Sequence, residues 1–504
     1  MIEEKKQNLI TRPPVVVILG HVDHGKSSIL EKIKDLKITE KESGGITQHI
    51  GAYEIEHSST GSGQAKKITF IDTPGHEAFD AMRSRGAKIA DIAILVIAAD
   101  EGIKPQTKEA ISHIKKAGIP MIIAFNKIDK PGADPEKIKR ELVKQDILVE
   151  SMGGKVPSIN TSAETGQGIS DLIELILLVA EMEDLKTDFS TLAQGVVIES
   201  YLGSNRGPTA TLILEKGVLK KGDIIATNSA LGKVRIMEDF QGNCVSQALP
   251  SIPVVVIGFE TVPGVGEEFK FFYSLEQAKS QIKKPKFFER TKNIIEKDKN
   301  KKSLNLILKI DVLGSLEAIE NVLKNIPQGK VSVNVLKAAT GDISDSDVRM
   351  AKTFNAKIIG FKVRTNQAAQ KLALREKITI MNFEVIYELA QAVRQFLEKK
   401  VGSEIVKTNI GKINILAIFK KEKNNQIVGG KVMTGEVKRG ANLEVYRDEE
   451  LAGKGKIIKL QQDKKDVDQV GKGRECGILF SGDLELKEGD VLEAYVEERV
   501  KGEL

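Results

Sequence analysis

The sequence predicts a multidomain chain of α/β and β architecture: an α/β domain with a mostly parallel sheet, two β-barrels and a small α/β/α domain, joined by helical linkers. Short apolar runs alternate with helical patterns over residues 13–185, and short strands with glycine turns fill residues 186–273. A turn sequence at Gly217–Gly222 recurs at Gly435–Gly440. Alternation indicates βαβ units, whereas closely spaced short strands are typical of barrels. A chain of 504 residues suits three or four domains.

Five apolar runs in the α/β domain are the expected strands. They are Val15–Leu19, Ile68–Ile71, Ile92–Ala98, Met121–Phe125 and Pro157–Asn160. Amphipathic stretches at Gln106–Lys116 and Glu136–Lys144 are expected helices between them. Ligands of such sheets bind beyond the carboxyl ends of the strands, so chemistry is expected there. Residues 1–12 are expected to be a short, polar, flexible tail.

The first strand runs into a glycine loop with the spacing of a phosphate-binding loop. The pattern G-x-x-x-x-G-K-[ST] is met without a gap between a strand and a helix. Glycine lets backbone N–H groups close on a phosphate, the helix N-terminus adds donors, and the lysine would reach the terminal phosphates. The alternative is a strand–helix turn that carries Gly-Lys-Ser by chance. The expected phosphate contacts are Gly20, His21, Val22, Asp23, His24, Gly25, Lys26, Ser27 and Ser28.

Further motifs follow later strands of this domain. After the second strand comes Asp72-Thr73-Pro74-Gly75, where the last N–H would sense a γ-phosphate. After the fourth comes Asn126-Lys127-Ile128-Asp129, whose last carboxylate suits the two adjacent donors of guanine. Alone, this tetrapeptide fits a helix-capping turn equally well. The N–H groups near Ser162 and Ala163 would meet guanine O6. All four motifs in this order, each at a strand end, predict a GTP-binding P-loop GTPase domain over residues 13–185.

Thr47 is the expected switch residue. It lies in the glycine-containing stretch Glu42–His49, between the phosphate loop and Asp72. Its hydroxyl would complete a Mg²⁺ shell with Ser27 and Asp72 when a γ-phosphate is present, and would leave it after hydrolysis. The alternative is a plain flexible loop.

His76 is the expected catalytic residue. It directly follows Gly75, and it would orient or polarise the attacking water because its unperturbed pKa lies near working pH. Phosphoryl transfer needs mainly positioning, so one such group suffices. His21, His24 and His49 lie in the same region but lack a convincing metal-ligand spacing, and they are expected to pack loops.

Five segments are expected after the first domain. They are a β-barrel at 186–273, a basic helical linker at 274–303, an α/β/α spacer domain at 304–382, a linker helix at 383–404 and a C-terminal β-barrel at 405–504. The spacer domain has neither a glycine loop nor a titratable cluster, so no chemistry is expected in it. The repeated turn favours two related barrels, with two similar hairpins as the alternative.

Composition excludes several classes of protein. No run reaches the ~18 apolar residues of a membrane span, and the N-terminus is neither a signal peptide nor an acid-poor transit peptide. Two cysteines, Cys244 and Cys476, fit a reducing compartment, so a cytoplasmic protein is expected. The net charge is +6, with basic excess over 281–303 and 399–472. Such an excess suits nucleic-acid phosphates, but a solvated surface explains it better.

Three stretches resemble the translational GTPases, and specifically bacterial translation initiation factor 2: Thr11–Lys26, Gly44–Tyr53 and Asp72–Phe79. The similarity continues over nearly the whole chain. It implies a GTPase that uses GTP or GDP with Mg²⁺ and in which the ribosome triggers the histidine that matches His76. It also implies a monomer, without membrane contact, that stabilises formylated initiator tRNA on the small ribosomal subunit and promotes subunit joining.

The end of the chain is similar to that family's motif for the formyl-methionyl end of the initiator tRNA. The expected tRNA contacts are Glu475, Cys476, Gly477 and Lys464. Cys476 would be a small apolar recognition residue, and a core cysteine is the alternative. The run Gln461-Gln462-Asp463 departs from the basic and aromatic residues common in the family, which would weaken phosphate attraction.

The resemblance implies two further helices: a solvent-exposed one around Phe287–Lys297, and one at Glu384–Lys400 that carries the terminal barrel toward the tRNA. The family's usual long N-terminal region is not in this sequence, so any ribosome anchoring that it provides elsewhere is expected to come from other surfaces or to be missing. Two other functions stay open. One is an elongation-type GTPase for another aminoacyl-tRNA, against which the spacer domain and long helix argue. The other is a ribosome-bound interaction factor with negligible catalysis.

Overall fold

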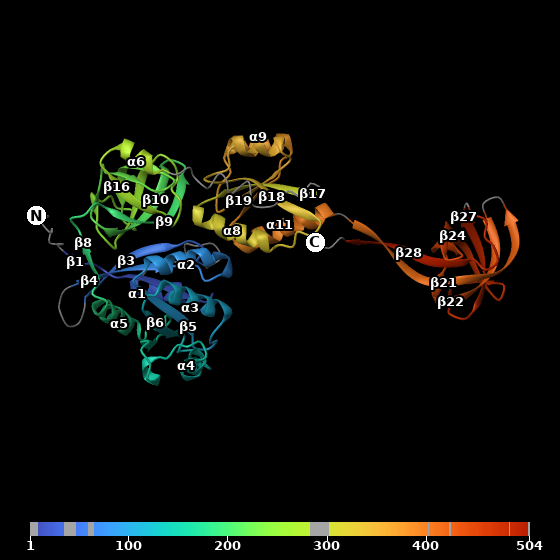
Figure 1. Cartoon of the computed structure of the whole chain (residues 1–504), viewed down its shortest axis with the longest axis horizontal. Coiled ribbons are helices and arrows are strands. Elements are labelled where there is room, and N and C mark those ends of the chain that lie inside the picture. The colour runs from blue at the N-terminus through green and yellow to red at the C-terminus, as the bar shows by residue number, and fades with distance from the viewer. Residues whose placement is uncertain are drawn as a thin grey trace, which may run out of the picture. The chain divides into compact units, whose positions relative to one another are not determined.

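The computed structural model describes residues 9–34, 47–58, 65–282, 302–401, 403–422, 425–482 and 484–501. The chain divides into two compact units, Met1–Leu397 and Glu398–Leu504 (Figure 1). The first unit contains an α/β sheet, a closed barrel and a smaller α/β sheet, and the second contains another barrel. The predicted fold class, α/β and β domains with two barrels, is therefore confirmed.

A six-stranded sheet forms the first part of the chain, in the order β3-β4-β2-β5-β6-β7. All neighbours are parallel except β3, which runs antiparallel to β4. The strands are β2 Val15–Gly20, β3 Gly51–Ser58, β4 Ala65–Asp72, β5 Ile92–Ala98, β6 Met121–Asn126 and β7 Ser158–Asn160. The five predicted strands are found, and the mostly parallel sheet is confirmed. Strand β3 was not predicted, since Glu54 and Glu56 interrupt its apolar residues.

Helices cover both faces of this sheet because successive strand residues point to opposite sides. Val16 and Ile18 of β2 belong to one core with Ile29 of α1 and Leu172 of α5. Val17, between them, faces Gly86 of α2 on the other side. The helices are α1 Lys26–Lys34, α2 Asp80–Ile89, α3 Pro105–Ala117, α4 Pro135–Val143 and α5 Ile169–Met182, with short 3₁₀ turns η3 Glu77–Phe79 and η4 Glu150–Met152.

The start of the described chain differs from the expected tail over residues 1–12. β1 (Leu9–Thr11) pairs antiparallel with β8 (Lys186–Asp188). The guanidinium of Arg12 then bonds both carboxylate oxygens of Asp91, at 2.6 and 2.7 Å. These pairings fix residues 9–12, and three-residue strands are too short to show in the hydrophobic pattern. Residues 1–8 lie outside the described residues.

Six strands close the first barrel in the order β10-β15-β13-β12-β16-β9. Its strands are β9 Gln194–Gly203, β10 Gly207–Lys216, β12 Ile224–Ala226, β13 Leu231–Glu238, β15 Pro253–Phe259 and β16 Glu268–Phe272, with a side pair of β11 Leu219–Lys220 and β14 Gln247–Ala248. One apolar core fills it, around residues such as Val197, Leu212 and Phe269. After it, α6 covers Leu275–Gln281. The helix expected around 287–297 lies outside the described residues.

The spacer sheet has four parallel strands in the order β18-β17-β19-β20. Its elements are β17 Lys302–Ile310, α8 Leu313–Asn325, β18 Val331–Thr340, α9 Asp345–Thr353, β19 Lys357–Phe361, α10 Gln367–Glu376 and β20 Ile380–Phe383, followed by α11 Ile386–Val401. Contrary to expectation, a titratable cluster is present. The buried carboxylate of Asp347 lies 2.8 Å from Lys337 Nζ and 3.8 Å from Lys309 Nζ. Three separate elements supply these residues, so no local pattern predicts them.

The second unit is also a six-stranded barrel. Its strands pair in the order β21-β28-β23-β24-β27-β22, and β22 pairs back to β21. They are β21 Ser403–Glu422, β22 Asn425–Lys438, β23 Asn442–Arg447, β24 Glu450–Gln462, β27 Glu475–Gly482 and β28 Val491–Lys501, with short β25 Lys465–Asp466 and β26 Gln469–Gly471. In the described parts of both units, every helix is too short or too polar to cross a membrane.

The repeated turn has the same backbone pattern in both barrels. The N–H of Gly222 donates to Val234 O at 2.8 Å, and the N–H of Gly440 donates to Ile457 O at 3.0 Å. The side pairs match as well, since Lys220 pairs with Gln247 and Lys438 with Gln469. The repeat therefore marks one turn used in two related barrels, rather than two merely similar hairpins.

Candidate functional site

The glycine loop turns sharply between β2 and α1. Gly25 has φ +86°, and a Cβ there would lie 2.2 Å from Nδ2 of Asn126, so only glycine fits. The N–H of Val22 donates to Gln106 Oε1 of α3 at 3.2 Å, which ties the loop to the next helix. Ser28 is exposed in the first turn of α1, whose free N–H groups point out of the helix. The sequence thus folds the predicted loop into an anion-binding shape.

Lys26 is buried beneath this loop. Its ammonium group donates to the carbonyl oxygen of His21 at 2.5 Å. Burial lowers the pKa of Lys26 to about 8, and the carboxylate of Asp72 partly opposes that shift. A Cβ on Gly75 would lie 2.4 Å from the Lys26 ammonium and 2.9 Å from the N–H of Val22. The backbone after β4 therefore lies directly against the phosphate loop and its lysine.

Three side-chain oxygens meet beside the loop, as predicted for a metal site. Ser27 Oγ lies 2.6 Å from Thr47 Oγ1 and 2.9 Å from Asp72 Oδ2, and the latter two are 3.4 Å apart. One carboxylate and two hydroxyl groups form a set of hard oxygen donors, which is the donor type that Mg²⁺ prefers. The residues present therefore fit Mg²⁺. Residues 42–46 of the predicted switch stretch lie outside the described residues.

Asn126 joins the phosphate loop to the last loop of the sheet. Its Nδ2 donates to His24 O at 2.9 Å, while its Oδ1 accepts from the N–H of Ala163 at 3.1 Å and from Thr161 Oγ1 at 3.4 Å. The Ser162 hydroxyl donates to the carboxylate of Asp129. The structure thus brings together all the residues predicted to hold guanine.

Lys127 and Ile128 belong to the same loop. Lys127 adopts φ +61°, and its ammonium lies 3.5 Å from Glu101. The N–H of Ile128 donates to Thr161 O at 3.3 Å. Directly after β4, the Thr73 hydroxyl donates to Ile18 O of β2 at 2.9 Å, which fixes the turn into Pro74.

His76 caps the 3₁₀ turn η3 that follows Gly75. Its Nδ1 accepts from the N–H of Ala78 at 3.0 Å. Its ring packs edge-to-face on Phe79, at 6.3 Å between centroids, and on Tyr387 of α11, at 4.4 Å. Burial lowers its pKa, with Glu77 opposing and Arg83 adding to the shift. A neutral ring that accepts at Nδ1 carries its proton on Nε2.

The other histidines have different surroundings. The rings of His21 and His24 meet edge-to-face at 5.0 Å, as expected for loop packing. Burial, with the neighbouring His21 charge, lowers the pKa of His24 to about 4. His49 does more than pack a loop, because its Nε2 lies 2.7 Å from the carboxylate of Asp311 in the spacer domain. The buried Glu199 of the first barrel is close to both, and burial raises its pKa to about 7.

Sequence reasoning missed Arg83, the largest fully buried side chain of the described chain. Its Nη1 donates to the carbonyl oxygens of Pro74, at 3.1 Å, and His76. Its Nη2 donates to Glu109 Oε2 at 2.9 Å. The one signal in the sequence is a charged residue on the sheet-facing side of α2, one turn before Gly86.

A group of possible metal ligands surrounds that guanidinium. Asp80, Glu109 and His113 place ligand atoms within 4.8 Å of one another. His113 Nε2 lies 2.5 Å from Asp80 Oδ1, and Arg83 Nη2 lies 2.9 Å from Glu109. The arginine thus supplies the positive charge that these carboxylates need, and the group is explained without a metal.

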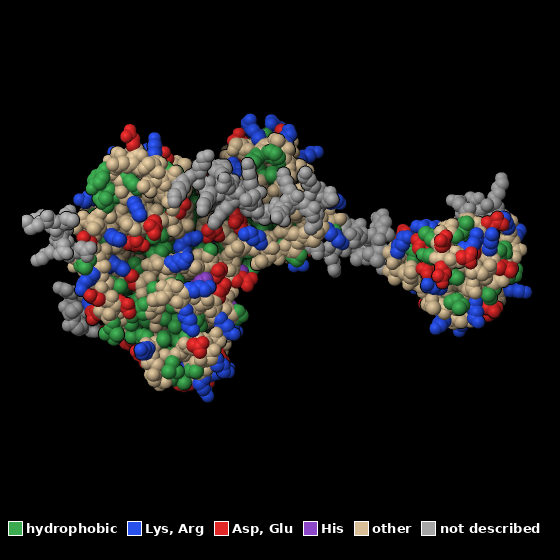
Figure 2. All heavy atoms as spheres, in the orientation of Figure 1, with side chains coloured by type: hydrophobic (Ala, Val, Ile, Leu, Met, Phe, Trp, Pro, Cys, Tyr) green, Lys and Arg blue, Asp and Glu red, His purple; other side chains and the backbone are tan. Residues whose placement is uncertain are grey.

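The predicted tRNA contacts lie on β27 and in the turn between β24 and β25. Glu475 is exposed on β27, and Lys464 is exposed in the turn with φ +63°. Cys476 is 5% exposed and belongs to the barrel core, as its alternative interpretation holds. Gly477 pairs with Gln461 across the strands. The face of this barrel seen in Figure 2 carries basic and acidic side chains interspersed.

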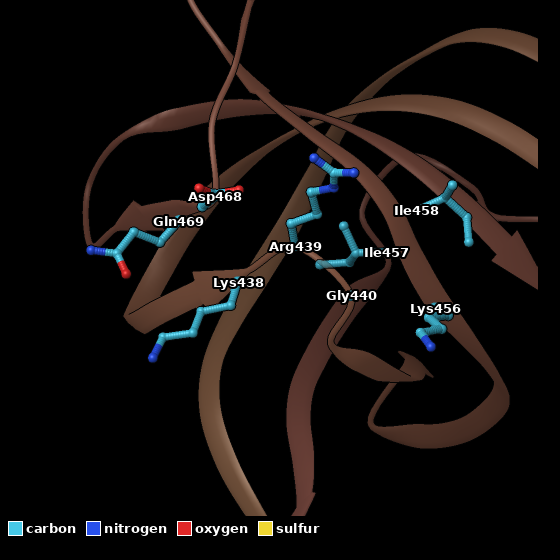
Figure 3. A pocket seen from close by; sticks show the side chains of 8 residues that line it. All are labelled: Lys438, Arg439, Gly440, Lys456, Ile457, Ile458, Asp468 and Gln469. Carbon is cyan, nitrogen blue, oxygen red and sulfur yellow. The ribbon is translucent and has the colours of Figure 1, made fainter.

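A cavity of about 540 Å³ lies at another part of this barrel, around the repeated turn. Its basic lining residues are Lys438, Arg439 and Lys456. Their charged ends point in different directions, away from any common point (Figure 3). They therefore do not form a cage for a single anion.

Three family models match successive parts of this chain. The family model of the elongation factor Tu GTP binding domain matches residues 12–182, that of elongation factor G domain 2 matches 192–271, and that of translation-initiation factor 2 matches 276–394. A solved structure, GDP-bound aIF5B from Aeropyrum pernix, is 26% identical, covers 96% of this chain and 92% of its own, and gives a TM-score of 0.47.

Whole-chain relatives share a single name. Chloroplastic translation initiation factor IF-2 of Euglena gracilis is 41% identical over 98% of this chain and 62% of its own length. IF-2 of Pelotomaculum thermopropionicum is 41% identical over 100% of this chain and 52% of its own length. This chain thus spans less than two thirds of several relatives. IF-2 of Halalkalibacterium halodurans is 41% identical over 99% of this chain and 70% of its own length. The chain therefore belongs to the translation initiation factor IF-2 family.

Proposed function

We propose that this chain is a translation initiation GTPase that binds GTP with Mg²⁺ at the carboxyl edge of the six-stranded sheet. The observation that carries the proposal is the meeting of Ser27, Thr47 and Asp72 beside the buried ammonium of Lys26. These oxygens would hold Mg²⁺, which neutralises charge on the β- and γ-phosphates. Thr47 would report the γ-phosphate, because its hydroxyl would complete the Mg²⁺ shell only while that phosphate is bound.

Base selection rests on Asp129. A carboxylate accepts from guanine N1–H and N2–H₂, whereas adenine presents an acceptor at N1. Ser162 holds Asp129 in place, and Asn126 fixes the two loops between which the base would lie. Changing Asp129 to Asn exchanges an acceptor for a donor, so nucleotide preference should shift toward xanthine. Competition between GTP and xanthosine triphosphate measures this, and unchanged selectivity for GTP would contradict the assignment.

Hydrolysis would use His76 to orient water. With Nδ1 occupied by the N–H of Ala78 and its pKa lowered by burial, the ring is neutral at pH 7 and offers Nε2–H as a donor. It would therefore position a water or γ-phosphate oxygen rather than remove a proton. Ribosome-stimulated GTP turnover is the measurement for His76→Ala. Unchanged turnover in this variant would remove His76 from its proposed role in hydrolysis.

The rest of the proposal concerns partners. Membership in the IF-2 family supports stabilisation of formylmethionyl initiator tRNA on the small ribosomal subunit by the C-terminal barrel, followed by subunit joining in the cytoplasm. Glu475, Gly477 and Lys464 would contact the tRNA, and buried Cys476 would shape the strand beneath them. Binding of formylated initiator tRNA should exceed binding of an unformylated elongator tRNA. Equal affinities would favour an elongation-type GTPase instead.

A further inference from the structure

We propose that Arg83 is a positioning residue for GTP hydrolysis: it holds the backbone on both sides of Gly75, and so sets the direction of the Gly75 N–H and the backbone that carries the His76 side chain. The inference rests on the proposed GTPase function and adds a residue to it. Arg83 takes no part in bond making, since its guanidinium faces backbone carbonyls and a carboxylate.

The two carbonyl partners of Arg83 belong to the residues on either side of Gly75. Pro74 and His76 flank Gly75, and the guanidinium donates to both of their carbonyl oxygens. Two donors on one planar group fix the two peptide planes relative to each other. Because Gly75 lies against Lys26 and the N–H of Val22, that geometry determines where its own N–H points.

Carboxylates of α2 and α3 anchor the Arg83 guanidinium. The side chain of Arg83 is fully buried, and Glu109 of α3 accepts from it at 2.9 Å. Asp80 lies 3.8 Å away and is itself held by His113 at 2.5 Å. A buried charge with a paired carboxylate and two carbonyl acceptors cannot rotate away without losing them together. The backbone on both sides of Gly75 is therefore attached to α2 and α3, and not only to its neighbours in sequence.

A positioning role of Arg83 differs from plain packing in the properties that it affects. A residue that only fills the core would affect every property of the domain alike. A residue that orients the Gly75 N–H and His76 should matter for the γ-phosphate and for turnover, but little for GDP, whose phosphates contact the glycine loop and Lys26. The contrast between GDP and GTP is thus the distinguishing measurement.

The experiment uses the full chain with Arg83→Met, Arg83→Lys and Glu109→Gln, and with Arg85→Gln as a matched control. Arg85 lies in α2, two residues after Arg83. It pairs with Glu317 of α8 at 2.8 Å and not with the backbone beside Gly75. Affinities for GDP and for a non-hydrolysable GTP analogue are measured at equilibrium. The kcat and KM of ribosome-stimulated GTP turnover are measured beside them, and thermal unfolding reports the fold.

For Arg83→Met, GDP affinity should stay within about twofold, while analogue affinity and kcat each fall by about tenfold or more, since the two charge-assisted hydrogen bonds to the carbonyls beside Gly75 are lost. Arg83→Lys should recover part of kcat, Glu109→Gln should lower it less, and Arg85→Gln should leave it unchanged. Equal losses for GDP and the analogue, or unchanged kcat in a folded variant, would overturn the proposal. If Arg83→Met does not fold, the Arg83→Lys and Glu109→Gln results decide in the same way. Absent GTP turnover in the unaltered chain would instead overturn the proposed function.

Discussion

The ring of His76 lies edge-on to the ring of Tyr387, with centroids 4.4 Å apart and planes at 74°. Within the described chain, the His76 side chain accepts a hydrogen bond from Ala78 and packs on the rings of Phe79 and Tyr387. None of its hydrogen bonds, ion pairs or ring contacts among the described residues is with the phosphate loop. Tyr387 belongs to α11, the helix that follows the spacer sheet. The contact thus joins the expected catalytic residue to an element more than 300 residues away in sequence.

Removing this ring contact should raise GTP turnover of the free protein. An aromatic pair of this geometry contributes about 0.5–1.5 kcal/mol, so Tyr387→Ala should make other orientations of His76 about two- to twelvefold more populated. Single-turnover hydrolysis without ribosomes measures the effect. Tyr387→Phe keeps the ring and should behave like the unaltered chain. A lower rate in Tyr387→Ala would mean that the contact supports the reactive orientation, and a gain that persists in the double variant with His76→Ala would rule out this route.

The junction of His49, Asp311 and Glu199 should make stability fall as pH rises. Glu199 is 7% exposed, and burial raises its pKa from 4.5 to about 7. Between these values the native carboxyl keeps a proton that the unfolded chain has lost, so stability is full below about pH 4.5 and is lost through about pH 7. His49 acts in the same direction: burial lowers its pKa, but the bond and charge of Asp311 outweigh burial and raise it.

Glu199→Gln removes that cost because a neutral amide replaces the buried acid. The stability gap between this variant and the unaltered chain should grow by about 2–3 kcal/mol from pH 5 to pH 8. Urea unfolding at both pH values measures it. Glu260→Gln, an exposed change in the same barrel, should give a constant gap. The same constant gap for Glu199→Gln would show that the carboxyl is already ionised in the native junction.

Much of the nucleotide site was predictable because each motif is local and follows a strand. The loop after β2, the turn after β4 and the tetrapeptide after β6 need only the rule that parallel strands end at one edge. Arg83 was not predictable, because its partners are backbone carbonyls before its own helix and a carboxylate on the next helix. The His49–Asp311 pair spans 262 positions, and no pattern within one segment reports such a contact.

The secondary structure was likewise predictable only in part. The alternating apolar runs predicted the parallel strands and the helices between them, since burial on both faces leaves a continuous apolar signal. β3 and β20 were not predicted because they lie at the edges of their sheets, where few residues are buried and the apolar pattern is weak. β1 was not predicted because it pairs with β8 over only three residues. The two barrels were predictable through the repeated turn, whose glycines Gly217 and Gly435 adopt φ +69° and +71°.

Cys476 should resist thiol reagents in the folded chain. Burial raises its pKa to about 11, so only about one molecule in a thousand carries the reactive thiolate at pH 8. Cys244 is exposed. A colorimetric disulfide reagent should therefore titrate one thiol quickly in the native protein and two after denaturation. Cys244→Ser should abolish the fast phase, whereas rapid reaction of that variant would place Cys476 at the surface, where direct contact with a ligand is open to it.

Asn126→Ala should weaken binding of both GDP and GTP. The side chain holds His24 O and the N–H of Ala163, so its loss frees the phosphate loop from the base-binding loop and leaves two buried groups without this partner. Two such losses cost about 2–4 kcal/mol, which is roughly a 30- to 1000-fold fall in affinity. Equilibrium titration with a fluorescent guanine nucleotide measures it.

The matched control for that change is Asn160→Ala, at the exposed end of the neighbouring strand β7. It removes the same group near the same edge, but within the described residues this side chain makes no hydrogen bond to either loop, so affinity should stay within about twofold. GDP and GTP should weaken alike in Asn126→Ala, because both carry the base and the β-phosphate. A loss confined to GTP would place the effect of Asn126 at the γ-phosphate, and unchanged affinity for both nucleotides would mean that the two loops hold their shape without it.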